Sequence, residues 1–316
     1  MTQNILVTGG AGFIGSHLCD TLLKQNHHII CLDNFNDFYN PKIKEANVAH
    51  HSNNPNYTLI RGDILDHSLL DTLFDTHSID GIIHLAARAG VRPSIEEPKR
   101  YQQVNIEGTL NILELARIHK IKKLLFASSS SVYGNNKKVP FSESDPVDQP
   151  VSPYAATKKA GELLCYNYHH LYHIPIVCLR FFTVYGPRQR PEMAIHKFAK
   201  LMSNEQPIPV FNNGNCRRDF TYIDDIIQGI INIYNHNFTF DIVNLGESET
   251  ITTLNLIKEL ESQLNCTANI QLMPAQPGDV EQTFADISKA QSTYQYNPTY
   301  PFKLGISKFV EWFNKN

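Results

Sequence analysis

Short apolar runs alternate with amphipathic segments through the first 180 residues. In the amphipathic segments apolar side chains recur at helical spacing, as at Ile14, Leu18 and Leu22. The runs themselves are nearly continuous in apolar character, which predicts strands buried on both faces of a parallel sheet. The predicted strands are residues 5–7, 29–32, 57–60, 81–85, 123–126 and 174–179. This alternation predicts an α/β fold with a doubly wound parallel sheet.

The alternation of apolar runs and amphipathic segments becomes less regular after about residue 180. Prolines interrupt it at Pro187, Pro191, Pro207 and Pro209. We therefore expect residues 1–180 to form the sheet domain and residues 181–316 to form mainly a smaller lobe. Residues 222–234 and 240–245 again have the pattern of a helix and a buried strand. Segments near 218–245 are thus expected to return to the main sheet. The Asn- and His-rich segment 50–56 is expected to be a loop.

Composition excludes several classes of protein. The 28 basic and 31 acidic residues leave a net charge of -3, which argues against nucleic acid as a partner. No apolar stretch reaches the roughly 18 to 20 residues of a membrane span, and no basic region leads into an apolar one at the N-terminus. We expect a cytoplasmic protein without membrane contact. The six cysteines form no C-x-x-C pair, so we expect neither a disulfide framework nor a zinc knuckle.

A glycine-rich segment, Gly9-x-x-Gly12-x-x-Gly15, follows the first predicted strand and opens a helix. Gly9 and Gly12 would let the backbone approach a pyrophosphate at the helix N-terminus, and Gly15 would allow close packing of helix on sheet. The second strand ends at Asp33, 18 residues after Gly15. A carboxylate there accepts hydrogen bonds from ribose hydroxyls and repels a 2′-phosphate, which favours NAD over NADP. The alternative is a turn residue that caps the next loop.

A second motif carries the candidate chemistry. Ser152 and Pro153 predict a helix start, and Tyr154 and Lys158 lie four residues apart on one face of that helix. An ammonium near a phenol stabilises the phenolate, so Tyr154 can act as a base nearer neutral pH. Residues 128–131 are all serine and place hydroxyls at the carboxyl end of the fifth strand. A surface Tyr–Lys pair and a polar turn are the alternatives, but the combination predicts a hydride-transfer site.

The sequence resembles the extended short-chain dehydrogenases/reductases, and among them the nucleotide-sugar epimerases, over essentially the whole chain. The shared motifs are Gly9-x-x-Gly12-x-x-Gly15, Asp33-Asn34, Gly62-Asp63, residues 84–87, Asn105-x-x-Gly108, residues 129–134, Tyr154-x-x-x-Lys158, residues 180–182 and residues 218–220. The segments most similar to UDP-glucuronate 4-epimerases are residues 34–39, 44–46, 89–92, 183–194 and 276–280. The resemblance implies a Rossmann fold with a UDP-sugar-binding lobe.

The resemblance also implies a mechanism. Ser129 would hydrogen-bond the sugar 4-hydroxyl, Tyr154 would take its proton, and Lys158 would orient the nicotinamide ribose. Hydride would pass from C4 to NAD, and the 4-keto sugar would turn and take it back on the other face. The implied substrate-binding residues are Arg92, Ser129, Ser130, Thr183, Arg190, Phe211 and Arg218. Arg92 is alternatively part of a charged loop.

Motifs and resemblance together give the cofactor set. The carboxyl ends of the third and fourth strands are expected at the same edge of the sheet as the glycine-rich turn. The expected NAD-binding residues are Gly9, Gly12, Phe13, Ile14, Asp33, Asn34, Asp63, Ile64, Leu85, Ala86, Ala87, Asn105, Tyr154 and Lys158.

Related enzymes run other reactions after the same oxidation. The similar 4,6-dehydratases carry Thr-Asp-Glu, and the glucuronate decarboxylases Thr-Ser-Glu, where this chain has Ser129-Ser130-Ser131. We therefore expect a simple epimerase, with UDP-glucuronate favoured over UDP-glucose and UDP-N-acetylglucosamine. Gln276 stands where many neutral-sugar epimerases have an arginine, which leaves the phosphate charge to Arg190 and Arg218. A net oxidoreductase or lyase, and a non-catalytic NAD-sensing protein, are the competing hypotheses.

Two further patterns bear on metal binding and assembly. His169 and His173 have i, i+4 spacing, but no third ligand lies nearby in the sequence, so no metal site is expected. A set of apolar positions on two predicted helices could form a helix-bundle homodimer or ordinary core. These positions are Leu110, Leu113, Leu163, Leu164, Tyr166 and Leu171.

Overall fold

The structure is a computed structural model that describes residues 2–274 and 280–316. The chain forms two compact units. Unit 1 takes in the chain up to Gly134, Pro146–Arg180 and Ile230–Val243, and unit 2 takes in Asn135–Asp145, Phe181–Gly229 and Asn244–Asn316. The assignment of residues 1–180 to cofactor binding and of residues 181–316 mainly to substrate binding stays a prediction.

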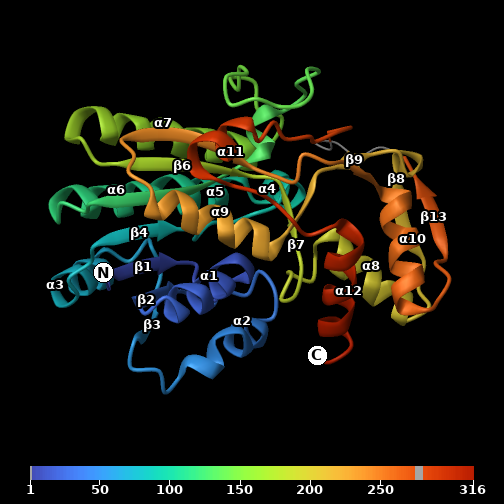
Figure 1. Cartoon of the computed structure of the whole chain (residues 1–316), viewed down its shortest axis with the longest axis horizontal. Coiled ribbons are helices and arrows are strands. Elements are labelled where there is room, and N and C mark those ends of the chain that lie inside the picture. Colours follow the sequence, from blue (N-terminus) through green and yellow to red (C-terminus); the bar gives the residue numbers. More distant parts are fainter. Residues whose placement is uncertain (1, 275–279) are drawn as a thin grey trace. The chain divides into compact units, whose positions relative to one another are not determined.

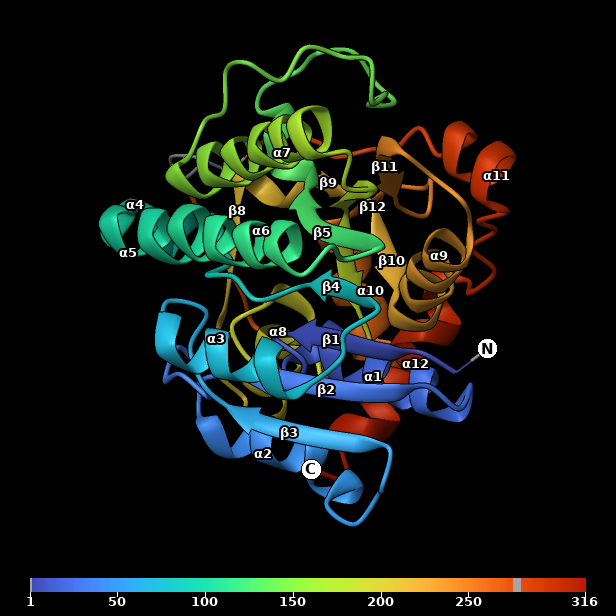
Figure 2. The same ribbon diagram turned by 90° about the vertical axis from the view of Figure 1, so that its left-hand side faces the viewer.

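Unit 1 is built around a seven-stranded sheet, whose strands Figures 1 and 2 show side by side. The strand order is β11-β6-β5-β4-β1-β2-β3, and the pairs β1–β2, β1–β4, β2–β3 and β4–β5 are parallel. The strands are β1 (Asn4–Thr8), β2 (His28–Asp33), β3 (Tyr57–Arg61), β4 (Gly81–His84), β5 (Lys123–Ser129), β6 (Ile176–Phe181) and β11 (Phe240–Leu245). The predicted doubly wound sheet is confirmed, and the order reverses between β1 and β4, where such sheets bind ligands.

Helices cover both faces of this sheet. Figure 2 shows α3, α6 and α7 together on one face and α1 on the other. The helices of unit 1 are α1 (Phe13–Lys24), α2 (Pro41–Val48), α3 (His67–Thr76), α4 (Val91–Glu96), α5 (Pro98–Gln102), α6 (Gly108–Ile118) and α7 (Pro153–Tyr172), with the short turns η1 (Ala49–His51), η2 (Gln103–Glu107) and η3 (Ser130–Tyr133). Helix α9 (Ile223–Asn235) belongs partly to each unit.

Two expectations about unit 1 were wrong. The strand β3 is not buried on both faces: Thr58 is exposed and Leu59 is 37% exposed, because β3 is the edge strand of the sheet. Residues 50–56 are not loop throughout, since the 3-10 turn η1 includes His50 and His51. His51 is buried there, against the ring of Tyr57.

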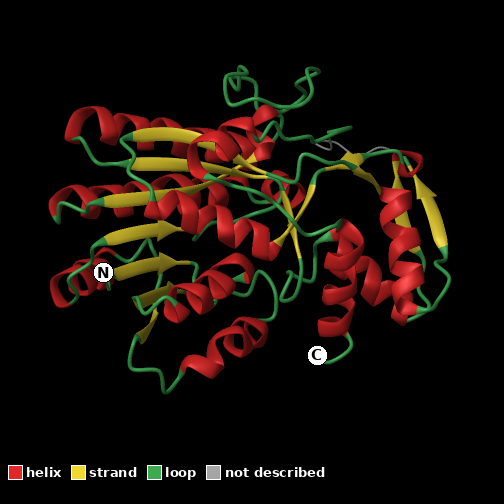
Figure 3. Cartoon of the chain, in the orientation of Figure 1, coloured by secondary structure: helices red, strands yellow, loops and turns green. Residues whose placement is uncertain are grey.

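The described residues of unit 2 form three two-stranded pairings in place of one large sheet. Figure 3 shows strands in yellow and helices in red. Its strands are β7 (Thr183–Tyr185), β8 (Ile208–Phe211), β9 (Arg217–Arg218), β10 (Phe220–Tyr222), β12 (Ile251–Thr252) and β13 (Ile270–Met273), and its other elements are α8 (Ala194–Ser203), α10 (Thr253–Leu264), α11 (Ser288–Tyr294), α12 (Phe302–Phe313) and η4 (Asn212–Gly214). The fully buried Asp219 accepts backbone N–H bonds from Glu247, Ser248 and Ala285, which joins distant segments.

Among the described residues, no helix is both long enough and apolar enough to cross a membrane.

Candidate active site

The segment from the end of β1 through the first turn of α1 admits only glycine at two positions. Gly9 has a φ of +69°, and a Cβ there would lie 2.8 Å from the backbone N of Ala86. A Cβ on Gly15 would lie 2.2 Å from the carbonyl O of Gly9. Gly12 is the N-cap of α1, and no described side chain caps this helix. The N-terminus of α1 therefore suits a phosphate, which takes its hydrogen bonds from backbone N–H groups.

Asp33, at the end of β2, is tied to this turn. Its carboxylate accepts hydrogen bonds from the backbone N–H of Ala11 at 3.2 Å and of Phe35 at 2.9 Å. The Nζ of Lys44 lies 3.7 Å from Asp33 Oδ1, and both side chains are 6% exposed. Asn47, on the same helix as Lys44, donates to the carbonyl of Ala11 at 3.1 Å. Helix α2 thus braces the glycine-rich turn, a role the sequence analysis did not assign to Lys44 or Asn47.

Apart from Phe13 and Ile14, which begin α1, the other expected cofactor residues in this region follow the ends of neighbouring strands. The Nδ2 of Asn34 donates to Oδ2 of Asp63 at 2.7 Å, which brings together the segments after β2 and β3. Leu85 and Ala86 follow β4, and their backbone N–H groups bond the carbonyl and hydroxyl of Thr8. Ala87 and Ile14 are half-buried, whereas Phe13 and Ile64 are buried side chains.

Asn105 is a buried brace. Its amide exchanges two hydrogen bonds with the backbone of Arg88, at 2.8 and 2.9 Å, and donates to Oγ1 of Thr157 at 3.0 Å. Thr157 lies on α7 between Tyr154 and Lys158. Asn105 therefore holds the segment after β4 against the helix that carries the candidate base.

The candidate catalytic residues come from β5 and α7. Ser129 ends β5, is 8% exposed, and its Oγ accepts a bond from the backbone N–H of Ser131. Ser152 caps α7 through the N–H of Ala155 at 3.1 Å, which confirms the predicted helix start. The half-buried ring of Tyr154 lies edge-on to the ring of Tyr101, with centroids 6.2 Å apart.

Lys158 is buried beneath the end of β5. It is 4% exposed, and its Nζ donates to the carbonyl of Ala127 at 2.7 Å. Burial lowers the pKa of Lys158 to about 8. The ammonium is thus held by one carbonyl near Ser129, on the same helix face as Tyr154.

We expect Lys158→Met to make the folded protein more stable at pH 7, by up to about 3 kcal/mol, while activity is lost. The folded pKa lies below the unfolded one, so wild-type stability should rise as pH increases from about 8 to 10.5. Urea unfolding of the two proteins at pH 7 and pH 10 measures this difference, which should shrink at the higher pH. Equal stability at pH 7 would contradict the expected cost of burying the ammonium.

A buried ion pair behind the site was missed in the sequence. Glu162 and Arg180 are each 1% exposed, and their side chains make two hydrogen bonds at 2.8 and 2.9 Å. Ser128, the neighbour of Ser129, donates its hydroxyl to Glu162 at 2.7 Å. Burial alone would raise the pKa of Glu162, but the bonds from Arg180 bring it below its usual range. A glutamate four residues after Lys158, on the same buried helix face, was the available signal.

The expected substrate residues other than the serines lie in separate parts of the fold. Arg92 is half-buried in α4 of unit 1, whereas the rest belong to unit 2. Thr183 begins β7 and Phe211 ends β8. The Nε of Arg190 pairs with Glu192 at 3.2 Å, and Nη1 of Arg218 donates to two backbone carbonyls. Gln276 lies outside the described residues.

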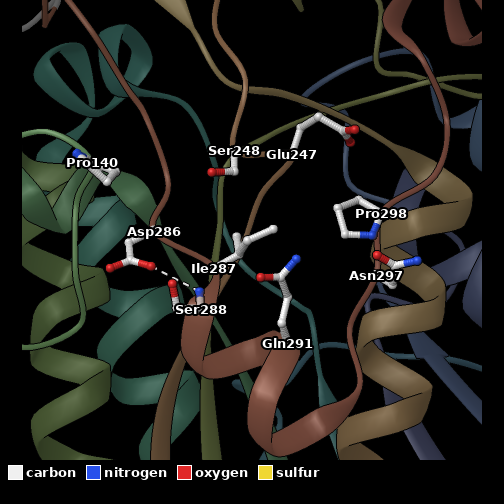
Figure 4. Close-up of a pocket in the computed structure, with 9 residues that line it drawn as sticks. All are labelled: Pro140, Glu247, Ser248, Asp286, Ile287, Ser288, Gln291, Asn297 and Pro298. Atoms are coloured by element: carbon white, nitrogen blue, oxygen red, sulfur yellow. Dashed lines mark hydrogen bonds between the residues drawn. The ribbon is translucent and has the colours of Figure 1, made fainter.

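Unit 2 also contains a polar hollow of about 390 Å³ (Figure 4). Its described lining is Pro140, Glu247, Ser248, Asp286, Ile287, Ser288, Gln291, Asn297 and Pro298. Burial raises the pKa of Glu247 to about 8. None of the expected site residues lines this hollow, so we do not place the candidate active site there.

Comparisons with known proteins show which family the chain belongs to. The family model described as GDP-mannose 4,6 dehydratase matches residues 6–309. The chain is 46% identical to an uncharacterised protein of Methanocaldococcus jannaschii, covering 99% of this chain and 97% of the relative. It is 43% identical to a UDP-glucuronate 4-epimerase of Thermodesulfobacterium geofontis, covering 98% and 96%.

A solved structure is similar over nearly its whole length. It is that of UDP-glucuronic acid 4-epimerase from Bacillus cereus in complex with UDP-glucuronic acid and NAD, and it is 40% identical, with 99% of each chain covered and a TM-score of 0.93. The resemblance to extended short-chain dehydrogenases/reductases is confirmed. The chain belongs to the GDP-mannose 4,6 dehydratase family and, within it, lies with the UDP-glucuronate 4-epimerases.

Proposed function

We propose that the protein is an NAD-dependent epimerase that inverts C4 of UDP-glucuronate to give UDP-galacturonate. The observation that carries the proposal is the placing of Lys158, buried under the serine-rich end of β5 and one helical turn from Tyr154. The relatives named for this reaction support the substrate, because they match over nearly the whole chain.

The residues that would hold NAD fit a dinucleotide. The N-terminus of α1 has no side-chain cap, so its backbone N–H groups suit the pyrophosphate, and Asp33 ends β2, the strand end where ribose hydroxyls are bound. When bound, NAD supplies a reversible hydride acceptor for the sugar C4. Ser129 hydrogen-bonds the 4-hydroxyl, and Tyr154 takes its proton. Lys158 stabilises the phenolate through its positive charge.

The choice of epimerisation rests on what the serine run lacks. Ser129, Ser130 and Ser131 offer hydroxyls but no carboxylic acid, so no side chain in this run is suited to expel a C6 hydroxyl. Incubation of the pure protein with UDP-glucuronate should give UDP-galacturonate without net NADH. Accumulation of NADH or of a lyase product would overturn the proposal. A preference for UDP-glucose would show that UDP-glucose, and not UDP-glucuronate, is the substrate.

A glucuronate epimerase must also protect its intermediate. Oxidation at C4 makes a β-keto acid, which loses carbon dioxide when the carboxyl-bearing bond aligns with the carbonyl π system. We propose that Ser129, Ser130 and Thr183, with an arginine at Arg92 or Arg190, fix the carboxylate out of that alignment.

We expect Thr183→Val and Arg190→Ala to lower kcat/KM for UDP-glucuronate by about 10-fold or more, since each removes a hydrogen bond to a charged group. A UDP-pentose should then appear among the products. Product ratios from the two variants and the wild type measure the effect. Unchanged ratios, together with equal turnover of UDP-glucose, would assign these groups to the diphosphate and sugar hydroxyls alone.

We expect NAD to bind much more tightly than NADP, because the carboxylate of Asp33 would face the 2′-phosphate. Lys44 lies 3.7 Å from Asp33 and offsets part of that charge, so Lys44→Met should widen the preference for NAD. Titration of NAD and NADP against the wild type and Lys44→Met measures the ratio of the two affinities. Equal affinities for NAD and NADP in the wild type would show that Asp33 does not determine a cofactor preference.

The same proposal includes a homodimer formed by α6 and α7. Leu163, Tyr166 and Leu171 on α7 are each more than half exposed, and Leu110 on α6 is 37% exposed, so the two contacting helices both present apolar side chains to solvent. Leu113 is buried in the core of unit 1, and Leu164 packs against the same core. We therefore no longer assign these two residues to the dimer interface. Sedimentation of the wild type and of Leu163→Glu tests the dimer.

A further inference from the structure

Unit 1 brings one carboxylate and two imidazoles to a single point outside the candidate active site. Asp20 lies on α1, and His50 and His51 lie in the turn η1. The Nε2 atoms of His50 and His51 approach the same oxygen, Oδ1 of Asp20, at 2.9 and 2.6 Å. All three ligand atoms lie within 4.8 Å of one another.

The surroundings orient these groups. His51 is buried, and its ring packs against Tyr57, with centroids 4.9 Å apart. The rings of His50 and His51 are themselves 3.9 Å apart. The side chain of His50 is 47% exposed, so one side of the cluster stays open to water. Two neighbouring histidines directed at one carboxylate oxygen form a partly built ligand set.

We propose that Asp20, His50 and His51 bind a divalent transition metal ion of the zinc class. Metal–ligand distances of about 2.0–2.2 Å place tetrahedral ligand atoms roughly 3.5 Å apart, so the present contacts need to open by less than about 1 Å. Two imidazole nitrogens favour zinc, nickel or copper over magnesium and calcium, which prefer oxygen ligands. Water completes the shell at the exposed side of His50.

The site would act on structure, not on the reacting sugar. It ties η1 to α1, and η1 directly follows α2. Lys44 and Asn47 of α2 contact Asp33 and the carbonyl of Ala11. A metal ion bound only to the folded form stabilises that form, so the segment 41–51 should open less often when metal is present.

The test uses the full chain, stripped of metal by a chelator and then titrated with Zn²⁺ in a calorimeter. We expect one saturable site that is lost in His50→Gln/His51→Gln and weakened in Asp20→Asn. The matched control is His169→Gln/His170→Gln, a second adjacent pair, in which His169 bonds the carbonyl of Ile174. This control should keep the site. Zinc-edge absorption should show nitrogen and oxygen ligands without sulfur, which separates the cluster from the six cysteines.

Hydrogen exchange supplies the second readout. Zn²⁺ should slow exchange in residues 41–51 of the wild type and leave the His50→Gln/His51→Gln protein unchanged. Zinc binding that is equal in all four proteins, sulfur in the metal shell, or no saturable binding would each overturn the proposal. Because none of these measurements depends on turnover, the result stands apart from the proposed epimerase activity.

Discussion

Tyr154→Phe should lower kcat by about 10²- to 10⁴-fold while the affinity for nucleotides is kept. The phenolic oxygen is the proposed proton acceptor, and a general base contributes a factor of this size. The aromatic ring stays, so its edge-on contact with Tyr101 is preserved and the local packing changes little. Steady-state kinetics with UDP-glucuronate, together with equilibrium binding of NAD and UDP, measure the two effects separately.

The matched control is Tyr172→Phe on the same helix. Tyr172 is 45% exposed and lies at the last turn of α7, so loss of its hydroxyl should leave kcat unchanged. Near-normal turnover in Tyr154→Phe would assign the base to another residue. Loss of nucleotide binding in that variant would show that Tyr154 serves structure as well as chemistry.

Glu162→Met should destabilise the protein by about 3–5 kcal/mol. It leaves the buried guanidinium of Arg180 without its carboxylate, and an uncompensated buried charge is far more costly than a lost surface pair. It also removes the acceptor of the Ser128 hydroxyl, next to Ser129. Urea unfolding gives the free energy. Glu311→Gln, which breaks the exposed pair with Lys315, should have little effect by comparison.

The double variant Glu162→Met/Arg180→Met decides between two explanations of that loss. If the loss comes from the stranded charge, removal of both partners should restore most of the stability, because apolar side chains of similar volume replace the pair. If the double variant is as unstable as Glu162→Met, the shape of the pair and its bond to Ser128 matter more than its charge.

Local patterns were enough to predict the sheet and the two motifs. Continuous apolar runs gave the strands, the glycine spacing gave the turn before α1, and Ser152 gave the start of α7. Each of these three features depends on residues that are close together in the sequence. The pairing of Lys44 with Asp33, the pairing of Glu162 with Arg180 and the burial of His51 depend on which distant segments meet, which no local period reveals.

The edge position of β3 is a similar case. Its residues have the apolar character of a buried strand, but burial is set by the strand order, and among the described residues no further strand lies beyond β3 in the sheet. Strand order depends on the crossover connections and not on the composition of the strand. The same limit applies to Leu113 and Leu163, which have similar helical periodicity but opposite exposure.

The interleaving of the two units bears on how the chain folds as it is synthesised. The strand β11 lies beside β6 in the sheet, although residues 182–239 separate them in the chain. Until residue 245 has left the ribosome, β6 remains an open edge with unpaired backbone groups, the kind of surface at which chains aggregate. A fragment cut at residue 180 would keep that edge permanently. Shortened forms of this protein should therefore include residues 230–245. Without these residues we expect the product to be poorly soluble and to depend on chaperones.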